Sequence, residues 1–116
     1  MMNFTGGLDD YQKRARKTVI YPRNQKIVYP ALGLAGEAGE VCEKVKKYLR
    51  GDSNDEYDAV DILKDGIEKE LGDVLWYIAN LATDLGLSLD VIAAKNLDKL
   101  RDRKRRNVLH GDGDDR

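Results

Sequence analysis

Two short acidic motifs, 33 positions apart, constrain the fold of this chain more than any other feature. The motif EAGEV contains the pair Glu37 and Glu40, and the motif ELGDV contains the pair Glu70 and Asp73. Successive residues of an α-helix turn by about 100°, so residues three apart lie about 60° from each other around the helix. Each pair of carboxylates is therefore predicted to lie on one side of its helix.

Apolar side chains fill the helix surface beside each acidic pair. Measured from the first acid of each motif, they occupy an arc from about 20° to about 140° around the helix axis. They are Leu34, Ala38, Val41, Cys42, Val45, Tyr48 and Leu49 in the first segment, and Ile67, Leu71, Val74, Leu75, Ile78, Leu81 and Leu85 in the second. If these two stripes pack together as a core, the four carboxylates can meet around one point.

Four clustered carboxylates repel one another unless a cation lies among them. Carboxylate oxygens are hard ligands of the kind that suit Mg²⁺ or Mn²⁺. The alternative is that both pairs are ordinary charges on solvent-exposed helix faces, where an acidic i,i+3 pair is common. Two pairs at matching angles beside a core favour the metal site, because an acid at the edge of a core needs a partner.

The remaining pattern predicts one all-α domain, a bundle of about four helices of which three are long. Both prolines come before the first acidic motif, and no run of alternating residues indicates a strand. Pro30 suits the first turn of a helix, Gly51 and Gly86 suit helix ends, and Ser88 suits an N-cap. The predicted helices span 8–19, 30–50, a segment that begins between 58 and 65 and ends at 84, and 89–107, with a connector at 20–29, a polar loop at 51–57 and an irregular tail at 108–116.

The composition excludes several classes of function. Charged residues make up 35% of the chain at a formal net charge of −1, so no global field attracts nucleic acid, and no stretch reaches the roughly 20 apolar residues of a membrane span. The basic run at 101–106 lies at a predicted helix C-terminus, where cations favour the helix dipole. We expect neither membrane nor nucleic-acid binding.

The single cysteine, Cys42, and the lack of an apolar leader predict a cytoplasmic protein, with Cys42 in its core.

The last predicted helix carries a second polar edge. Asn96 falls inside its apolar arc, and Lys99 and Arg103 flank Asn96 at i+3 and i+7. A buried asparagine needs hydrogen-bond partners, and cations beside it can meet phosphate oxygens. The alternative is a polar stripe whose long side chains reach solvent. Trp76 lies off the main apolar stripe and is predicted to contact another subunit rather than to stack on a base.

These residues together resemble the MazG-like, all-α nucleoside triphosphate pyrophosphohydrolases, over about residues 11–103. The resemblance is carried by GLAGEAGE at 33–40, by ELGDVLWY at 70–77, and by the polar edge on the last helix. In that family an E-x-x-E motif and an E-x-x-D motif hold Mg²⁺, which implies Glu37, Glu40, Glu70 and Asp73 here. Many members carry a glutamate where this chain has Gly36, and the linker between the motifs is long, so the number of metal ions stays open.

The resemblance also implies an activity, the conversion of a nucleoside triphosphate to its monophosphate and pyrophosphate. Either Glu37 or Glu40 would activate water, and Tyr77 would stack on sugar or base. The other implied substrate contacts are Lys44, Lys99 and Arg103 on phosphate oxygens and Asn96 on sugar or phosphate. Members assemble into dimers or tetramers, with sites built partly across subunits.

Three alternatives remain open from the sequence. A related all-α hydrolase of another nucleotide anhydride, such as dUTP or phosphoribosyl-ATP, would share the same motifs. A non-catalytic helical module that binds a protein partner would show the same apolar stripes without a response to Mg²⁺. A nucleic-acid-binding protein would use the run at 101–106, and its binding would be steeply sensitive to salt.

Overall fold

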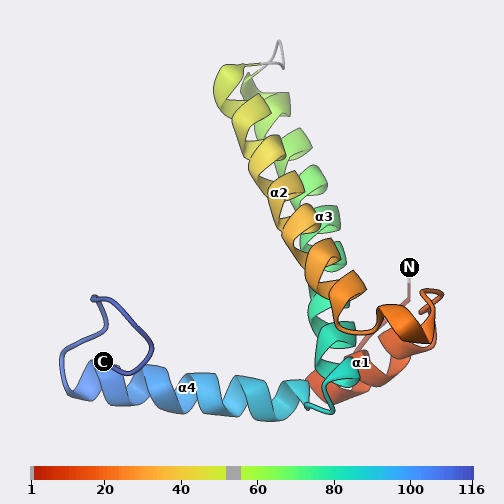
Figure 1. Ribbon diagram of the computed structural model, residues 1–116. Coiled ribbons are helices and arrows are strands. Elements are labelled where there is room, and N and C mark those ends of the chain that lie inside the picture. The colour runs from red at the N-terminus through yellow and green to blue at the C-terminus, as the bar shows by residue number, and fades with distance from the viewer. Residues whose placement is uncertain (1, 52–55) are drawn as a thin grey trace.

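The structure, a computed structural model, describes residues 2–51 and 56–116, and over these residues it is all-α with no strand (Figure 1). The predicted fold class is thereby confirmed. The elements are α1 (Leu8–Arg16), the short 3₁₀ helix η1 (Arg23–Gln25), α2 (Val28–Arg50), α3 (Glu56–Asp84) and α4 (Leu89–Arg105).

The two long helices α2 and α3 pack side by side along most of their length and form an antiparallel hairpin (Figure 1). The helix α2 ends at Gly51, whose φ of 77° is readily reached without a Cβ, and whose N–H bonds to the carbonyl of Tyr48 at 3.1 Å. The short helix α1 crosses the C-terminal half of α3. The core therefore has two parts, the α2–α3 seam and the α1–α3 crossing.

The helix α4 leaves this hairpin at a bend of 103° and projects as a separate arm (Figure 1). The corner is a Schellman motif, in which Gly86 has φ 69° and the N–H of Leu87 bonds to the carbonyl of Ala82 at 2.8 Å. Ser88 then caps α4 by accepting the N–H of Val91 at 3.2 Å. The predicted stop at Gly86 and the predicted N-cap at Ser88 are both confirmed.

Four helix ends differ from their predicted positions. The helix α2 begins at Val28 rather than 30, because the turn at Ile27 already directs the chain into the helix, so the predicted connector at 20–29 is wrong at 28 and 29. The helix α1 ends at Arg16 rather than 19, because the Thr18 hydroxyl bonds to the Ala15 carbonyl at 2.7 Å and competes with the helical ladder. The helix α3 begins at Glu56, earlier than predicted, since Gly66 is tolerated where Lys44 covers it. The helix α4 ends at Arg105 rather than 107. The predicted loop at 51–57 is thus wrong at 56 and 57, and residues 52–55 lie outside the described residues.

The predicted core is wrong in part, because much of the apolar stripe is exposed in one chain. Among the described residues, Ala15, Ala79, Ala82 and Leu89 form a small buried apolar cluster, with Tyr11 and Trp76 packed against it. Cys42, predicted in the core, is exposed, and Leu71 and Leu49 are 53% and 78% exposed. A two-helix hairpin buries only the line along which its helices touch, so the flanks of each stripe need a further covering element.

One buried carboxylate joins α1, the connector and α2 to the end of α3. The Asp84 side chain, which is fully buried, accepts hydrogen bonds from Arg16 Nη1 at 2.6 Å, Tyr21 Oη at 3.0 Å and the Ile27 N–H at 2.9 Å. Burial opposes its charge, but these donors hold the pKa of Asp84 below its usual value. Ile27 itself has φ 67° and ψ −56°, with the Val28 N–H bonded to the Lys26 carbonyl at 2.7 Å, a strained γ-turn that directs the start of α2.

No single helix in the described part of the chain is both long and apolar enough to cross a membrane. Among the described residues, one bent pair of helices, α3 and α4, reaches that length and composition when the two are taken together.

We predict that Asp84→Ala lowers the free energy of unfolding at neutral pH by about 1–3 kcal/mol, because buried donors lose their acceptor. The measurement is urea unfolding, with Asp10→Ala as control, since the Asp10–Arg14 ion pair is exposed and should contribute less than about 1 kcal/mol. A lowered pKa means that the Asp84 stabilisation is present above the ordinary pKa of 3.8 and is lost as pH falls below it. Equal losses in the two variants would show that Asp84 does not organise this junction.

Candidate metal site on the α2–α3 hairpin

Three of the four predicted acids meet at the α2–α3 seam. Glu37 from α2 and Glu70 and Asp73 from α3 each offer a carboxylate oxygen, and these oxygens lie within 4.8 Å of one another. Glu37 and Glu70 are partly buried and Asp73 is exposed. Glu40 lies outside this group, although its charge acts on Glu37. The predicted convergence of the two acidic shoulders is therefore present in the structure for three carboxylates.

The register of the hairpin is set by small residues on either side of the acids. Gly33 lies one turn before Glu37, and a Cβ at this position would overlap the ring of Tyr77, one turn after Asp73. On the other side, the Lys44 side chain passes Gly66, where a Cβ would lie 3.3 Å from Lys44 Cδ. Both contacts are close approaches that a larger residue would obstruct. They hold α2 and α3 in the alignment that brings Glu37 opposite the acids of α3.

The negative charges of the three clustered carboxylates favour the binding of a cation. A hydrogen bond with the Glu70 carboxyl raises the pKa of Glu37, and burial and the nearby charges of Asp73, Glu70 and Glu40 raise it further. Like charges this close cannot all be ionised at low cost unless a cation is present. The donor set consists only of carboxylate oxygens, which fits Mg²⁺ or Mn²⁺ and does not fit softer metals that prefer thiolate or imidazole.

A cluster of aromatic rings adjoins the acids. The rings of Tyr29 and Tyr77 have centroids 6.4 Å apart, Tyr77 meets Trp76 edge-on at 5.0 Å, and Tyr21 stacks on Tyr29 at 5.0 Å. Burial raises the pKa of Tyr77, and so do Tyr29 and the charges of Glu37 and Asp73. Tyr77 is thus beside the site, as predicted. Tyr21 and Tyr29 were not foreseen, because both fell in the segment predicted as a connector, 20–29, although Tyr29 lies in the first turn of α2.

Trp76 makes its contacts within the chain. Its Nε1–H donates to Thr18 Oγ1 at 2.7 Å, and the ring packs against the small core at the α1–α3 crossing. The side of α3 assigned from sequence to another subunit is therefore met by α1 and the residues that follow it. Helix periodicity locates a side off the main stripe but does not reveal which element covers it.

The polar edge of α4 lies on the other arm of the molecule, away from the acids (Figure 1). Within one chain the structure does not bring Asn96, Lys99 or Arg103 to the carboxylates. Asn96 is exposed, so its predicted burial is wrong, because α4 projects from the hairpin as a separate arm. Arg103 is buried under the C-terminal tail, where it and Lys99 contact Asp114.

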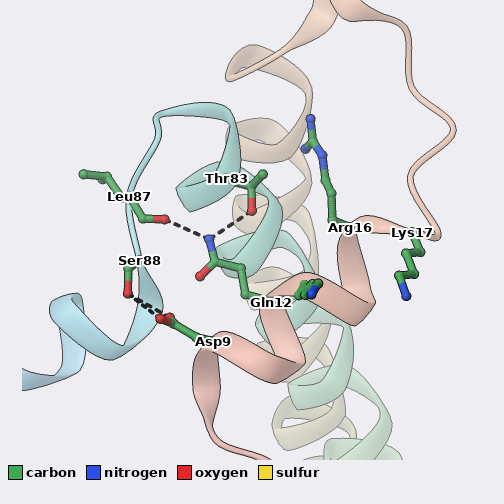
Figure 2. Close-up of a pocket in the computed structure, with 8 residues that line it drawn as sticks. Asp9, Gln12, Arg16, Lys17, Thr83, Leu87 and Ser88 are labelled. Carbon is green, nitrogen blue, oxygen red and sulfur yellow. Dashed lines mark hydrogen bonds between the residues drawn. The ribbon is translucent and has the colours of Figure 1, made fainter.

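A separate pocket of about 530 Å³ lies between α1 and the α3–α4 corner (Figure 2). Its buried residue Gln12 donates to Thr83 Oγ1 at 2.9 Å and to the Leu87 carbonyl at 2.8 Å, and accepts the Leu89 N–H at 2.9 Å. Asp9 accepts hydrogen bonds from the Ser88 hydroxyl at 2.8 Å and the Asp90 N–H at 2.9 Å. These groups are mutually satisfied, so they fix the angle of α4 rather than offer free chemistry. Sequence reasoning missed Gln12, since one glutamine on a polar helix gives no signal.

The comparison that decides the family covers the site and both arms. The MazG nucleotide pyrophosphohydrolase domain matches residues 29–108, which include all of α3 and α4 and all of α2 except Val28. The chain belongs to the MazG nucleotide pyrophosphohydrolase family. The Gene 37 protein of Mycobacterium phage L5 is 42% identical over 117 residues, covering 94% of this chain and 98% of that protein. No solved structure matches the chain.

The match confirms the family resemblance drawn from the acidic motifs. Glu37, Glu70, Asp73, Lys99 and Arg103 all lie within the matched part of the MazG domain. The helix α1 and most of the tail lie outside it, although α1 supplies Gln12, which fixes the corner, and Arg16, which pairs with Asp84. The helix α1 therefore stabilises the matched domain from outside the matched segment.

We predict that Gly33→Ala destabilises the MazG domain by about 1–3 kcal/mol, because the added methyl overlaps the Tyr77 ring and forces the helices apart. Gly39→Ala is the matched control on the same helix, since nothing lies within 4 Å of a Cβ there. That control should be neutral or more stable by up to about 1 kcal/mol, as expected for alanine in a helix. Denaturant unfolding measures both, and equal stabilities would refute the register contact.

Proposed function

We propose that this MazG domain is a Mg²⁺-dependent pyrophosphohydrolase that converts a nucleoside or deoxynucleoside triphosphate to its monophosphate and pyrophosphate. The observation that carries the proposal is the convergence of the Glu37, Glu70 and Asp73 oxygens within 4.8 Å. Membership of the MazG family supports the reaction class. Removal of noncanonical or surplus nucleotides is the role that we assign to this activity.

Glu37, Glu70 and Asp73 would hold the metal, with Mn²⁺ as a possible substitute for Mg²⁺. The ion would neutralise phosphate charge and polarise the phosphorus under attack. Glu40 lies next to this group but outside it. Of the two candidates, Glu40 is therefore better placed to accept the proton of the attacking water, while Glu37 serves as a ligand.

The surroundings of the acids suit the rest of a nucleotide. Lys44 lies against α3 at Gly66, one turn before Glu70, where its ammonium group can reach a phosphate oxygen. Tyr77, supported by Tyr29, presents an aromatic edge on the other side of the acids for sugar or base. The phosphates would thus lie toward Lys44 and the nucleoside toward the tyrosines.

Asn96, Lys99 and Arg103 can contribute only from a second copy of the chain, because α4 projects away from its own acids. Apolar residues exposed on both arms are the surfaces that such a partner would cover. They include Leu71 and Ile78 on α3 and Val91, Leu97 and Leu100 on α4. We propose a homodimer or homotetramer in which α4 of one copy approaches the hairpin of another.

The metal site is tested by removing one acid at a time. We predict that Glu70→Gln or Asp73→Asn abolishes turnover and reduces the rise in melting temperature that Mg²⁺ causes. The metal-free variants should be as stable as the original or more so, because one of several repelling charges is gone. Glu40→Gln should also abolish turnover but retain most of the Mg²⁺ response, because Glu40 is not among the three ligands.

Glu68→Gln is the matched control for these variants. Glu68 is exposed and lies about 160° around α3 from Glu70, so its loss should change stability by less than about 0.5 kcal/mol. Its turnover and its Mg²⁺ response should equal those of the original protein. If Glu68→Gln and Glu70→Gln give the same turnover and the same Mg²⁺ response, the carboxylates do not form a metal site.

The reaction is tested by identifying products from a panel of ribo- and deoxynucleoside triphosphates, with dUTP and phosphoribosyl-ATP included, each with Mg²⁺. We predict pyrophosphate and the monophosphate as the first products. Initial release of orthophosphate and a diphosphate would contradict the proposed point of attack. A panel without any turnover, from protein whose melting temperature does not respond to Mg²⁺, would favour the non-catalytic interaction module.

A further inference from the structure

The C-terminal tail, residues 107–116, folds back onto the end of α4 instead of extending into solvent (Figure 1). Asn107 adopts φ 61°, and the Val108 N–H bonds to the Arg103 carbonyl at 2.8 Å, which reverses the chain in a Schellman turn. The Arg116 side chain then donates to the carbonyls of Val108 at 3.1 Å and Leu109 at 2.9 Å. The tail is irregular, as predicted, but hydrogen bonds close it into a loop.

This loop lies on the two cations of α4 that the proposed function assigns to phosphate. Arg103 Nη2 donates to the Asp114 main-chain carbonyl at 2.5 Å and approaches the Asp114 carboxylate at 3.4 Å. Lys99 Nζ contacts the same Asp114 carboxylate oxygen at 3.1 Å. The Asp114 carboxylate thus occupies the position in which a phosphate oxygen would contact Lys99 and Arg103.

The tail satisfies Arg103 incompletely. The Arg103 side chain is only 5% exposed, yet its Nε atom is buried and has no hydrogen-bond partner in the described part of the chain. In the described part of the chain, the hydrogen bonds of the guanidinium to Gly113 and Asp114 are all made by Nη2. A guanidinium binds an oxyanion best in a bidentate manner, through two parallel N–H groups. A phosphate could engage Nε together with Nη2, so it would satisfy Arg103 better than the tail does.

Asp114 is also weakly held. Its carboxylate is 84% exposed, so its ion pairs with Lys99 and Arg103 are screened by water and are readily exchanged. We infer that the tail is an internal competitor: Asp114 occupies Lys99 and Arg103 until phosphate groups of a ligand displace it. This inference rests on the proposed function for the role of the two cations, and it adds a built-in limit on substrate affinity.

The test is the binding of inorganic pyrophosphate to the metal-free chain of 116 residues in the presence of a chelator, which removes any contribution from the carboxylate site. Binding is followed by titration calorimetry and by nuclear magnetic resonance of the Arg103 Nε–H and of the Gly113 and Asp114 amides. Asp114→Asn should bind pyrophosphate about threefold more tightly than the original, the effect of losing an exposed ion pair. Asp112→Asn, which makes the same charge change in the same loop, should bind like the original.

The resonances give a second readout that does not depend on a variant. In the original chain, bound pyrophosphate should shift the Arg103 Nε–H signal and make the Gly113 and Asp114 amides more mobile. Equal affinities of Asp114→Asn and Asp112→Asn would overturn the inference. So would bound pyrophosphate with unchanged tail amides, or no binding by either the original or Asp114→Asn, since each would make the tail contact merely structural.

Nucleotide turnover of the original chain, measured separately, distinguishes the two ways to fail. Turnover with no difference between Asp114→Asn and Asp112→Asn would overturn the tail inference alone. Tighter pyrophosphate binding by Asp114→Asn without turnover of any nucleotide would overturn the proposed function alone.

Discussion

The approach of α2 to α3 at Gly33 is the contact on which the rest of the site depends. Because the glycine has no side chain, the Tyr77 ring can lie against the backbone of α2. That contact fixes how far each helix is displaced along the other, and hence which residue of α3 faces Glu37. A slip by one helical turn would move Glu37 about 5.4 Å along α3, which exceeds the 4.8 Å spread of the three oxygens. The acidic cluster is therefore a consequence of backbone packing.

Helical periodicity was sufficient to predict the fold class, and it predicted the convergence of four acids, of which the structure brings three together. Glu37, Glu70 and Asp73 each lie beside an apolar stripe. Two such stripes can pack in few ways without burying an acid that has no partner. Capping chemistry was equally direct at Gly51, Gly86 and Ser88, because each of these residue types satisfies a local backbone requirement. These features depend on residues close together in the sequence, so the sequence alone reveals them.

Features that depend on distant residues could not be predicted in this way. Asp84 joins segments whose separations along the chain reach 68 residues, and nothing local marks it as buried. The exposure of Asn96 reflects the direction in which α4 leaves the hairpin, which is fixed at the corner by contacts to Gln12 and Asp9. Cys42 is exposed because a two-helix hairpin buries only the line along which its helices touch. Periodicity predicts that a face is apolar, but it does not state whether the same chain or another copy covers that face.

The corner at Gln12 has a further consequence for the order in which the protein folds. Its hydrogen bonds join residues 71–81 positions apart, whereas α2 and α3 are neighbours in sequence and form a hairpin through a short connection. Contacts between near neighbours incur less loop-closure entropy and form sooner. During synthesis, α1 must therefore wait until residues 87–90 have emerged before the corner can close. We therefore expect the direction of α4 to be established after α2 and α3 have paired and the acids have met.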